Sequence, residues 1–155
     1  MVLEPRDMNT ISLSQLVPIL QLAIGPVILI SGVGLLLLTL TNRFGRMVDR
    51  SRLLNQELES ESLASGEADR LQAQIDILHR RAEILRLSII LGAITVLLVG
   101  VLILVLFLSA LLKVEAGPLI IAIFCVGQLS LIGSMLAFIR DMNLSLKAVR
   151  LEIEH

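Results

Sequence analysis

The stretch TNRFGRMVDR, residues 41–50, begins a long polar segment that continues to Arg86 and decides the fold of this 155-residue chain. Residues 41–86 hold eight of the thirteen Lys and Arg residues, and apolar runs lie on both sides. The chain is 55% hydrophobic, with a mean hydropathy of +0.88. Because ordinary soluble domains are about 45–50% apolar, this composition indicates an integral membrane protein.

Three runs without a charged residue are long enough to cross a bilayer as helices. They have 25, 26 and 21 residues and occupy residues 16–40, 87–112 and 119–139. About 20 apolar residues are enough to span the hydrocarbon core as a helix. The remaining segments are then a tail at 1–15, a polar segment at 41–86, a short turn at 113–118 and a last helix at 140–155. The predicted fold is therefore all-α, with three transmembrane helices.

The distribution of basic residues predicts the orientation. Eleven of the thirteen Lys and Arg residues lie in 41–86 or after residue 139, whereas only Arg6 and Lys113 lie on the other side of the membrane. Since cytoplasmic loops carry an excess of Lys and Arg, the N-terminus is expected outside and the C-terminus in the cytoplasm. The net charge of −1 argues against a nucleic-acid partner, which would favour a basic surface.

The polar segment itself has a regular pattern. Apolar residues recur every three or four positions on each side of a break at 59–66, as in two helices that pack along a heptad-like seam. We expect an antiparallel cytoplasmic hairpin that extends the first two membrane helices. Its predicted core consists of Phe44, Met47, Leu54, Leu58, Leu71, Ile75, Leu78 and Leu85.

The junction Asn42-Arg43-x-x-Arg46-x-x-Asp49-Arg50, which Gly25-Pro26 precedes, resembles a bacterial membrane-protein family catalogued as domain of unknown function 2721. The resemblance covers most of the chain, including Arg80, Arg81 and Arg86 before the second span and Arg140-Asp141 after the third. It implies the same architecture and a bacterial inner membrane. The family has no established activity, so the resemblance implies no site residues.

Catalytic chemistry has no visible basis in the sequence. His79 and His155 have no Cys or His at ligand spacing, and neither a phosphate loop nor a nucleophile motif is present. No charged residue lies inside the three predicted spans, so a proton relay is not indicated. We expect neither an enzyme nor a cofactor.

Polar residues inside the predicted spans have two possible roles. Four of them are candidate contact or pore residues: Gln21, Gln128, Ser130 and Ser134. They either form hydrogen bonds between helices or line a water-filled path in an oligomer. Gly25-Pro26 lies in the middle of the first span, where proline removes a backbone hydrogen bond and is expected to kink the helix.

Arg43, Arg46 and Arg50 share one helix face just beyond the first span. They are interpreted as anchors for anionic lipid headgroups, or alternatively as a ring at the mouth of an oligomeric pore. Two functions follow from these patterns. The first is a self-associating scaffold or assembly factor whose cytoplasmic hairpin docks a partner protein or its own copies. The alternative is a homo-oligomeric ion channel with its pore near the Gly25-Pro26 kink.

Overall fold

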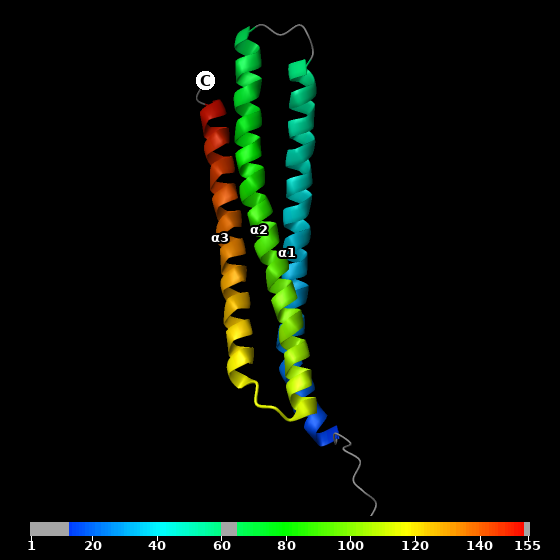
Figure 1. The fold of residues 1–155 in the computed structure, drawn as a ribbon. Helices are drawn as coiled ribbons and strands as arrows, with labels where there is room; N and C mark the ends of the chain where they lie inside the picture. Colours follow the sequence, from blue (N-terminus) through cyan, green and yellow to red (C-terminus); the bar gives the residue numbers. More distant parts are fainter. Residues whose placement is uncertain (1–12, 60–64, 154–155) are drawn as a thin grey trace, which may run out of the picture.

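The computed structural model describes residues 13–59 and 65–153, and side-chain positions are described for residues 17, 18, 20–59, 66 and 69–144. The described residues form three α-helices, which are α1 (Leu13–Glu59), α2 (Ser65–Leu112) and α3 (Gly117–Ile153) (Figure 1). Each helix carries a stretch long and apolar enough to cross a membrane, and these stretches lie within Leu20–Glu59, Asp69–Leu112 and Gly117–Leu144. The prediction of an all-α protein with three apolar spans is confirmed.

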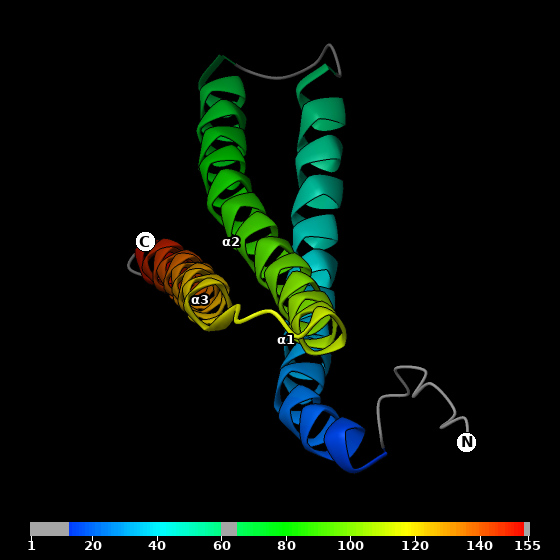
Figure 2. The same ribbon diagram turned by 60° about the horizontal axis from the view of Figure 1, so that its bottom comes forward.

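The three helices form one layer in which α2 packs against both α1 and α3 (Figures 1 and 2). The chain passes up α1, down α2 and up α3, so α2 is antiparallel to both neighbours (Figure 1). This order brings the polar ends of all three helices to the same end of the molecule. The turn between α2 and α3 lies at the opposite end (Figure 1).

Each helix continues beyond its predicted span. With 47, 48 and 37 residues, α1, α2 and α3 all exceed the roughly 20 residues needed to cross the hydrocarbon core. The residues predicted as a separate helix at 140–155 continue α3 as far as Ile153. The predicted tail at 1–15 falls almost wholly outside the described residues, as do residues 60–64 of the predicted break.

The turn between α2 and α3 is shorter than predicted, because α3 already begins at Gly117. Lys113, the residue after the end of α2, has a φ of 53°, the left-handed conformation that commonly follows the last turn of a helix. The N–H of Val114 donates to the carbonyl of Ser109 at 3.1 Å, which satisfies an otherwise free carbonyl at the end of α2. Pro118 lies in the first turn of α3, where its missing N–H costs no helical hydrogen bond.

Two prolines lie inside α1, and the helix continues through both. Pro26 has no N–H, so the carbonyl of Leu22 receives no helical hydrogen bond from it. The kink at Gly25 and Pro26 stays a prediction.

The packed core lies near the basic ends of the helices. Leu40, Met47 and Leu85 are buried there, and four partly buried residues pack against them: Leu36, Phe44, Ile89 and Phe138. In the most apolar window of α1, α2 and α3, only 11%, 22% and 17% of residues are buried. Most of the apolar surface in these windows therefore faces away from the other helices of the same subunit.

The eight residues predicted as the hairpin core differ in exposure. Met47, Leu54 and Leu85 are buried. The other five are half-buried: Phe44, Leu58, Leu71, Ile75 and Leu78.

Candidate functional site: a buried carboxylate between two arginines

The carboxylate of Asp141 on α3 lies between an arginine of α1 and an arginine of α2. Its side chain has no exposed surface. Oδ2 lies 3.2 Å from Nε of Arg43, and Oδ1 lies 3.3 Å from Nε of Arg81. The three side chains, which we call the ion triad, link all three helices at one point.

The two arginines contact the carboxylate differently. Nε–H of Arg81 donates a hydrogen bond to Oδ1 of Asp141. Arg43 makes an ion-pair contact without hydrogen-bond geometry, and Oδ2 has no hydrogen-bond partner among the described residues. The guanidinium of Arg43 also lies 5.6 Å from the centre of the Phe138 ring, within the range of a cation–π interaction. Arg43 is therefore held from two sides by α3.

Burial makes the pairing energetically necessary. The side chains of Arg43 and Arg81 are only 21% and 16% exposed, and that of Asp141 is 0% exposed. Taking such charges out of water is costly, and removing one partner of a buried pair typically costs about 3–5 kcal/mol. The two guanidinium groups compensate the carboxylate and leave one excess positive charge. The triad thus fixes the lateral position of α3 against α1 and α2.

The triad lies close to the expected membrane boundary. Arg43 follows the first predicted span by three residues, and Asp141 follows the third by two. Arg81 precedes the second predicted span by six residues, or about 9 Å of helix. All three charges therefore lie just beyond the hydrocarbon segments, where a charged side chain costs less than at the bilayer centre.

The structure separates three arginines that the sequence pattern grouped together. Arg43 is half-buried and paired with Asp141, whereas Arg46 and Arg50 are exposed. The interpretation as headgroup anchors or as a pore mouth therefore remains for Arg46 and Arg50, whose side chains are exposed. Arg43 is instead paired with the carboxylate of Asp141.

Sequence reasoning did not single out Asp141. Its helical spacing carried a usable signal, because Ser134, Phe138 and Asp141 are separated by four and three residues and so share one face of α3. This face includes Ser134, one of the polar residues that could form hydrogen bonds between helices. A carboxylate on such a face needs a cationic partner.

Hydroxyl groups join α2 to α3 inside the predicted membrane region. Ser88 Oγ donates to the carbonyl of Ser134, and Ser134 Oγ donates to the carbonyl of Ser88, both at 2.7 Å. Ser130 Oγ donates to the carbonyl of Leu91 at 2.8 Å, and Thr95 Oγ1 reaches the carbonyl of Gly127 at 3.4 Å. These contacts recur at each helical turn and hold the two helices in register. Ser130 and Ser134 are thus occupied within one subunit.

Glycine permits close packing where α1 and α3 both approach α2. A Cβ atom at Gly92 would lie 2.8 Å from Cδ2 of Leu37 on α1 and 3.4 Å from Oγ of Ser134 on α3. By contrast, a Cβ atom at Gly25, Gly32 or Gly34 would meet nothing within 4 Å. Gly92 therefore serves packing within the subunit.

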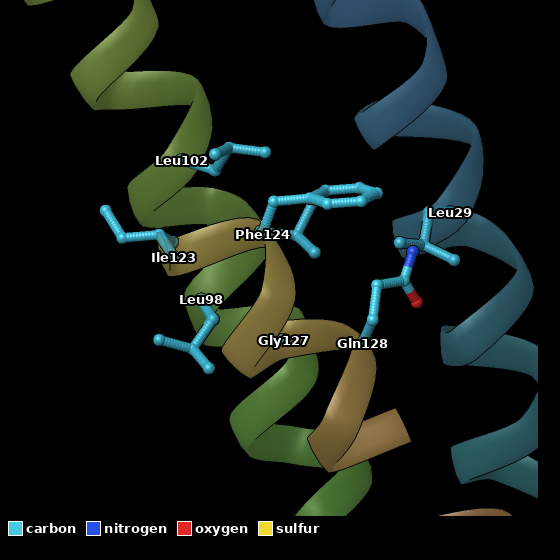
Figure 3. A pocket seen from close by; sticks show the side chains of 8 residues that line it. Leu29, Leu98, Leu102, Ile123, Phe124, Gly127 and Gln128 are labelled. Carbon is cyan, nitrogen blue, oxygen red and sulfur yellow. The ribbon is translucent and has the colours of Figure 1, made fainter. Parts of the chain in front are cut away.

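A groove of about 300 Å³ lies between α1 and α3. Its lining residues are Gly25, Pro26, Leu29, Val99, Leu102, Phe124 and Gln128. Figure 3 shows the side chains of Phe124 and Gln128 extending from α3 toward α1, with the Gln128 amide beside Leu29. Gln21, the other glutamine in a predicted span, is exposed and does not line this groove.

Among the residues that the structure describes, no group of three His, Cys, Asp or Glu side chains is placed to hold a metal ion. Cys125 is exposed on α3.

Three long apolar helices, with charged groups gathered beyond their hydrophobic stretches, define the class as a multi-pass α-helical membrane protein. A family model described as protein of unknown function (DUF2721) matches residues 23–151, so the chain belongs to that family. The match includes all three members of the ion triad and every residue of the groove. Comparisons with curated proteins and with solved structures find no match.

Proposed function

We propose that this protein is a self-associating scaffold or assembly factor of the bacterial inner membrane. In this proposal the polar halves of α1 and α2 form a cytoplasmic hairpin, the N-terminus lies outside, and the hairpin docks further copies or a cytoplasmic partner. The concentration of Lys and Arg at this end of the molecule supports that orientation.

The observation that carries the proposal is a pair of exposed apolar side chains on the hairpin. Leu53 of α1 is 56% exposed and Ile77 of α2 is 52% exposed. Both belong to the segment 41–86, which is expected in water. Apolar groups gain about 25 cal/mol for each Å² removed from water, so covering both side chains favours association.

Helix geometry places Leu53 and Ile77 on the same side of the hairpin. Leu53 comes directly before Leu54, which is buried, and Ile77 comes directly before Leu78, which is half-buried. Leu54 and Leu78 each face the other helix of the hairpin. Because the two helices are antiparallel and right-handed, the same one-residue offset rotates both side chains toward the same side. We call Leu53 and Ile77 the hairpin patch.

The two residues also lie at the same height along the hairpin. Gly92 and Leu37 lie opposite each other on α2 and α1. Leu53 is sixteen residues from Leu37, and Ile77 is fifteen residues from Gly92, in the same direction along the antiparallel pair. The difference of one residue corresponds to about 1.5 Å. The hairpin patch can thus be covered by a single helix of another copy.

The ion triad would make the hairpin an effective platform. It joins α1, α2 and α3 near the expected membrane surface, so the base of the hairpin has a fixed position relative to the membrane helices. A partner bound to the hairpin is then held at a defined distance from the bilayer.

The channel alternative receives less support. The hydroxyls of Ser130 and Ser134 already donate to backbone carbonyls of α2. Gln21 and Gln128 are the two glutamines expected to line a water-filled path through a channel. Only Gln128 lines the groove between α1 and α3.

Native mass spectrometry of detergent-purified protein tests the scaffold. We expect an oligomer of the unmodified chain. For the double variant Leu53→Asp with Ile77→Asp, we expect a dissociation constant at least about tenfold higher. The control Gln56→Asp with Gln72→Asp adds the same charge at exposed positions of the same helices and should leave the oligomer unchanged. A monomeric unmodified chain, or equal oligomers for all three proteins, overturns the proposal.

A further inference from the structure

The groove between α1 and α3 combines an apolar wall with one hydrogen-bonding side chain. Val99 and Leu102 of α2 form its floor, and Pro26 and Leu29 line it from α1. The amide of Gln128 is the polar side-chain group in this lining. The groove lies near the middle of the predicted spans, so its natural occupants are molecules dissolved in the bilayer.

The Gln128 amide needs a partner that the subunit does not supply. Gln128 is half-buried, and its amide has no hydrogen bond within the described part of the chain. An amide without a partner is costly in hydrocarbon, where no water can replace the missing bond. A ligand that satisfies it must therefore carry a hydrogen-bonding group on an otherwise apolar body.

The size and the aromatic wall narrow the choice of ligand. A volume of about 300 Å³ is at the lower end for small-molecule sites, so the groove accommodates one ring-sized group. The Phe124 ring lies between Leu102 and Leu29 (Figure 3). Because Phe124 also lines the groove, its ring offers a flat surface for stacking. The acyl chain of a phospholipid would fill the volume and leave the amide unpaired.

We propose that this groove binds a membrane-dissolved quinone, a flat ring that carries carbonyl groups on an apolar tail. The side-chain NH₂ of Gln128 donates to a ring carbonyl, Phe124 stacks on the ring, and Pro26, Leu29, Val99 and Leu102 surround its apolar parts. The site is separate from the hairpin, so it stands or falls independently of the scaffold function.

Tryptophan fluorescence supplies the test, since the chain has neither Trp nor Tyr. In Phe124→Trp the new indole replaces one flat ring of the groove by another. In the control Leu129→Trp the indole lies within the same predicted span, about 7.5 Å further along α3, at a position that is 68% exposed. Each full-length variant in detergent is titrated with a decyl-tailed benzoquinone, which quenches indole on contact.

We expect saturable quenching of the Phe124→Trp variant and only linear, collisional quenching of the Leu129→Trp variant. Adding Gln128→Leu to Phe124→Trp should weaken the saturable phase by about tenfold, which is the loss of one hydrogen bond in an apolar site. Adding Gln21→Leu instead removes an amide outside the groove and should change nothing. Equal linear quenching at both positions overturns the proposal, as does saturable quenching that does not depend on Gln128.

A second measurement covers the case in which Phe124→Trp does not fold. The unmodified chain is irradiated with an azido-quinone and digested, and the labelled peptide is sequenced. Labelling of Phe124, Leu102 or Leu29 that excess decyl-tailed benzoquinone suppresses supports the site. Labelling spread over exposed residues such as Leu129, without suppression, contradicts it.

Discussion

Arg43 on α1 and Asp141 on α3 approach to 3.2 Å between Nε and Oδ2, although α2 is the helix that packs against both of their helices. The contact joins two outer helices through long side chains at the end of the molecule where the basic residues gather. Arg81 of α2 contacts Oδ1, the other carboxylate oxygen of Asp141. The stability of the helix layer should therefore depend strongly on Asp141.

Replacing Asp141 by Asn should lower the free energy of unfolding by about 3–5 kcal/mol, because it leaves two largely buried guanidinium groups without a countercharge. Equilibrium unfolding in mixed detergent micelles measures the change. Asp49→Asn removes a carboxylate at an exposed position of α1 and should change stability by no more than about 0.5 kcal/mol. Equal effects of the two substitutions would show that the ion triad has no special role.

Removing the whole triad should be less harmful than removing its carboxylate. In the triple variant Arg43→Met, Arg81→Met and Asp141→Leu, no buried charge remains, and apolar side chains of similar length fill the space. Such replacements of buried ion pairs are often neutral or stabilising, by about 1–4 kcal/mol. We expect the triple variant to unfold at a higher detergent or denaturant concentration than Asp141→Asn. A triple variant less stable than Asp141→Asn would contradict this account.

The reciprocal hydrogen bonds of Ser88 and Ser134 should show coupling. Each of Ser88→Ala and Ser134→Ala should lower the free energy of unfolding by about 0.6 kcal/mol, and by no more than about 1.7 kcal/mol, which are the average and the maximum for hydrogen bonds between membrane helices. The double variant should cost less than the sum, because the two hydroxyls also contact each other at 3.3 Å. Ser31→Ala removes a hydroxyl bonded only within α1 and should be nearly neutral. Strict additivity would contradict the paired arrangement.

Enlarging Gly92 should disrupt packing, whereas the same change at Gly34 should not. A leucine at residue 92 must displace Leu37 and crowd Ser134, and overpacking of this kind typically costs about 1–3 kcal/mol. At residue 34 nothing lies within 4 Å of the new Cβ, and replacing a helical glycine gains up to about 1 kcal/mol. Thermal unfolding in detergent of Gly92→Leu and Gly34→Leu distinguishes the two positions. Loss of oligomers in Gly34→Leu, with the subunit still folded, would instead assign Gly34 to a contact between copies.

Much of the architecture could be predicted from local sequence. Three uncharged apolar runs predicted three helices, since only helices and closed barrels satisfy the backbone within a bilayer. The predicted hairpin-core residues Met47, Leu54 and Leu85 are buried in the structure. The continuation of α1 into the polar segment was predicted, whereas residues 140–153 were predicted as a separate helix and instead continue α3, because hydropathy changes there and the local backbone preference does not.

The candidate site depended on contacts that no local pattern contains. Hydropathy and charge along the chain by themselves determined the class of protein, the number of spans and the helical character of the polar segment, because each depends on residues that are close in sequence. Only the tertiary structure decided that Arg43, among three similar arginines, turns toward Asp141, and that Gln128 rather than Gln21 lines the groove. These choices depend on the rotation and spacing of helices that pack together from distant parts of the chain.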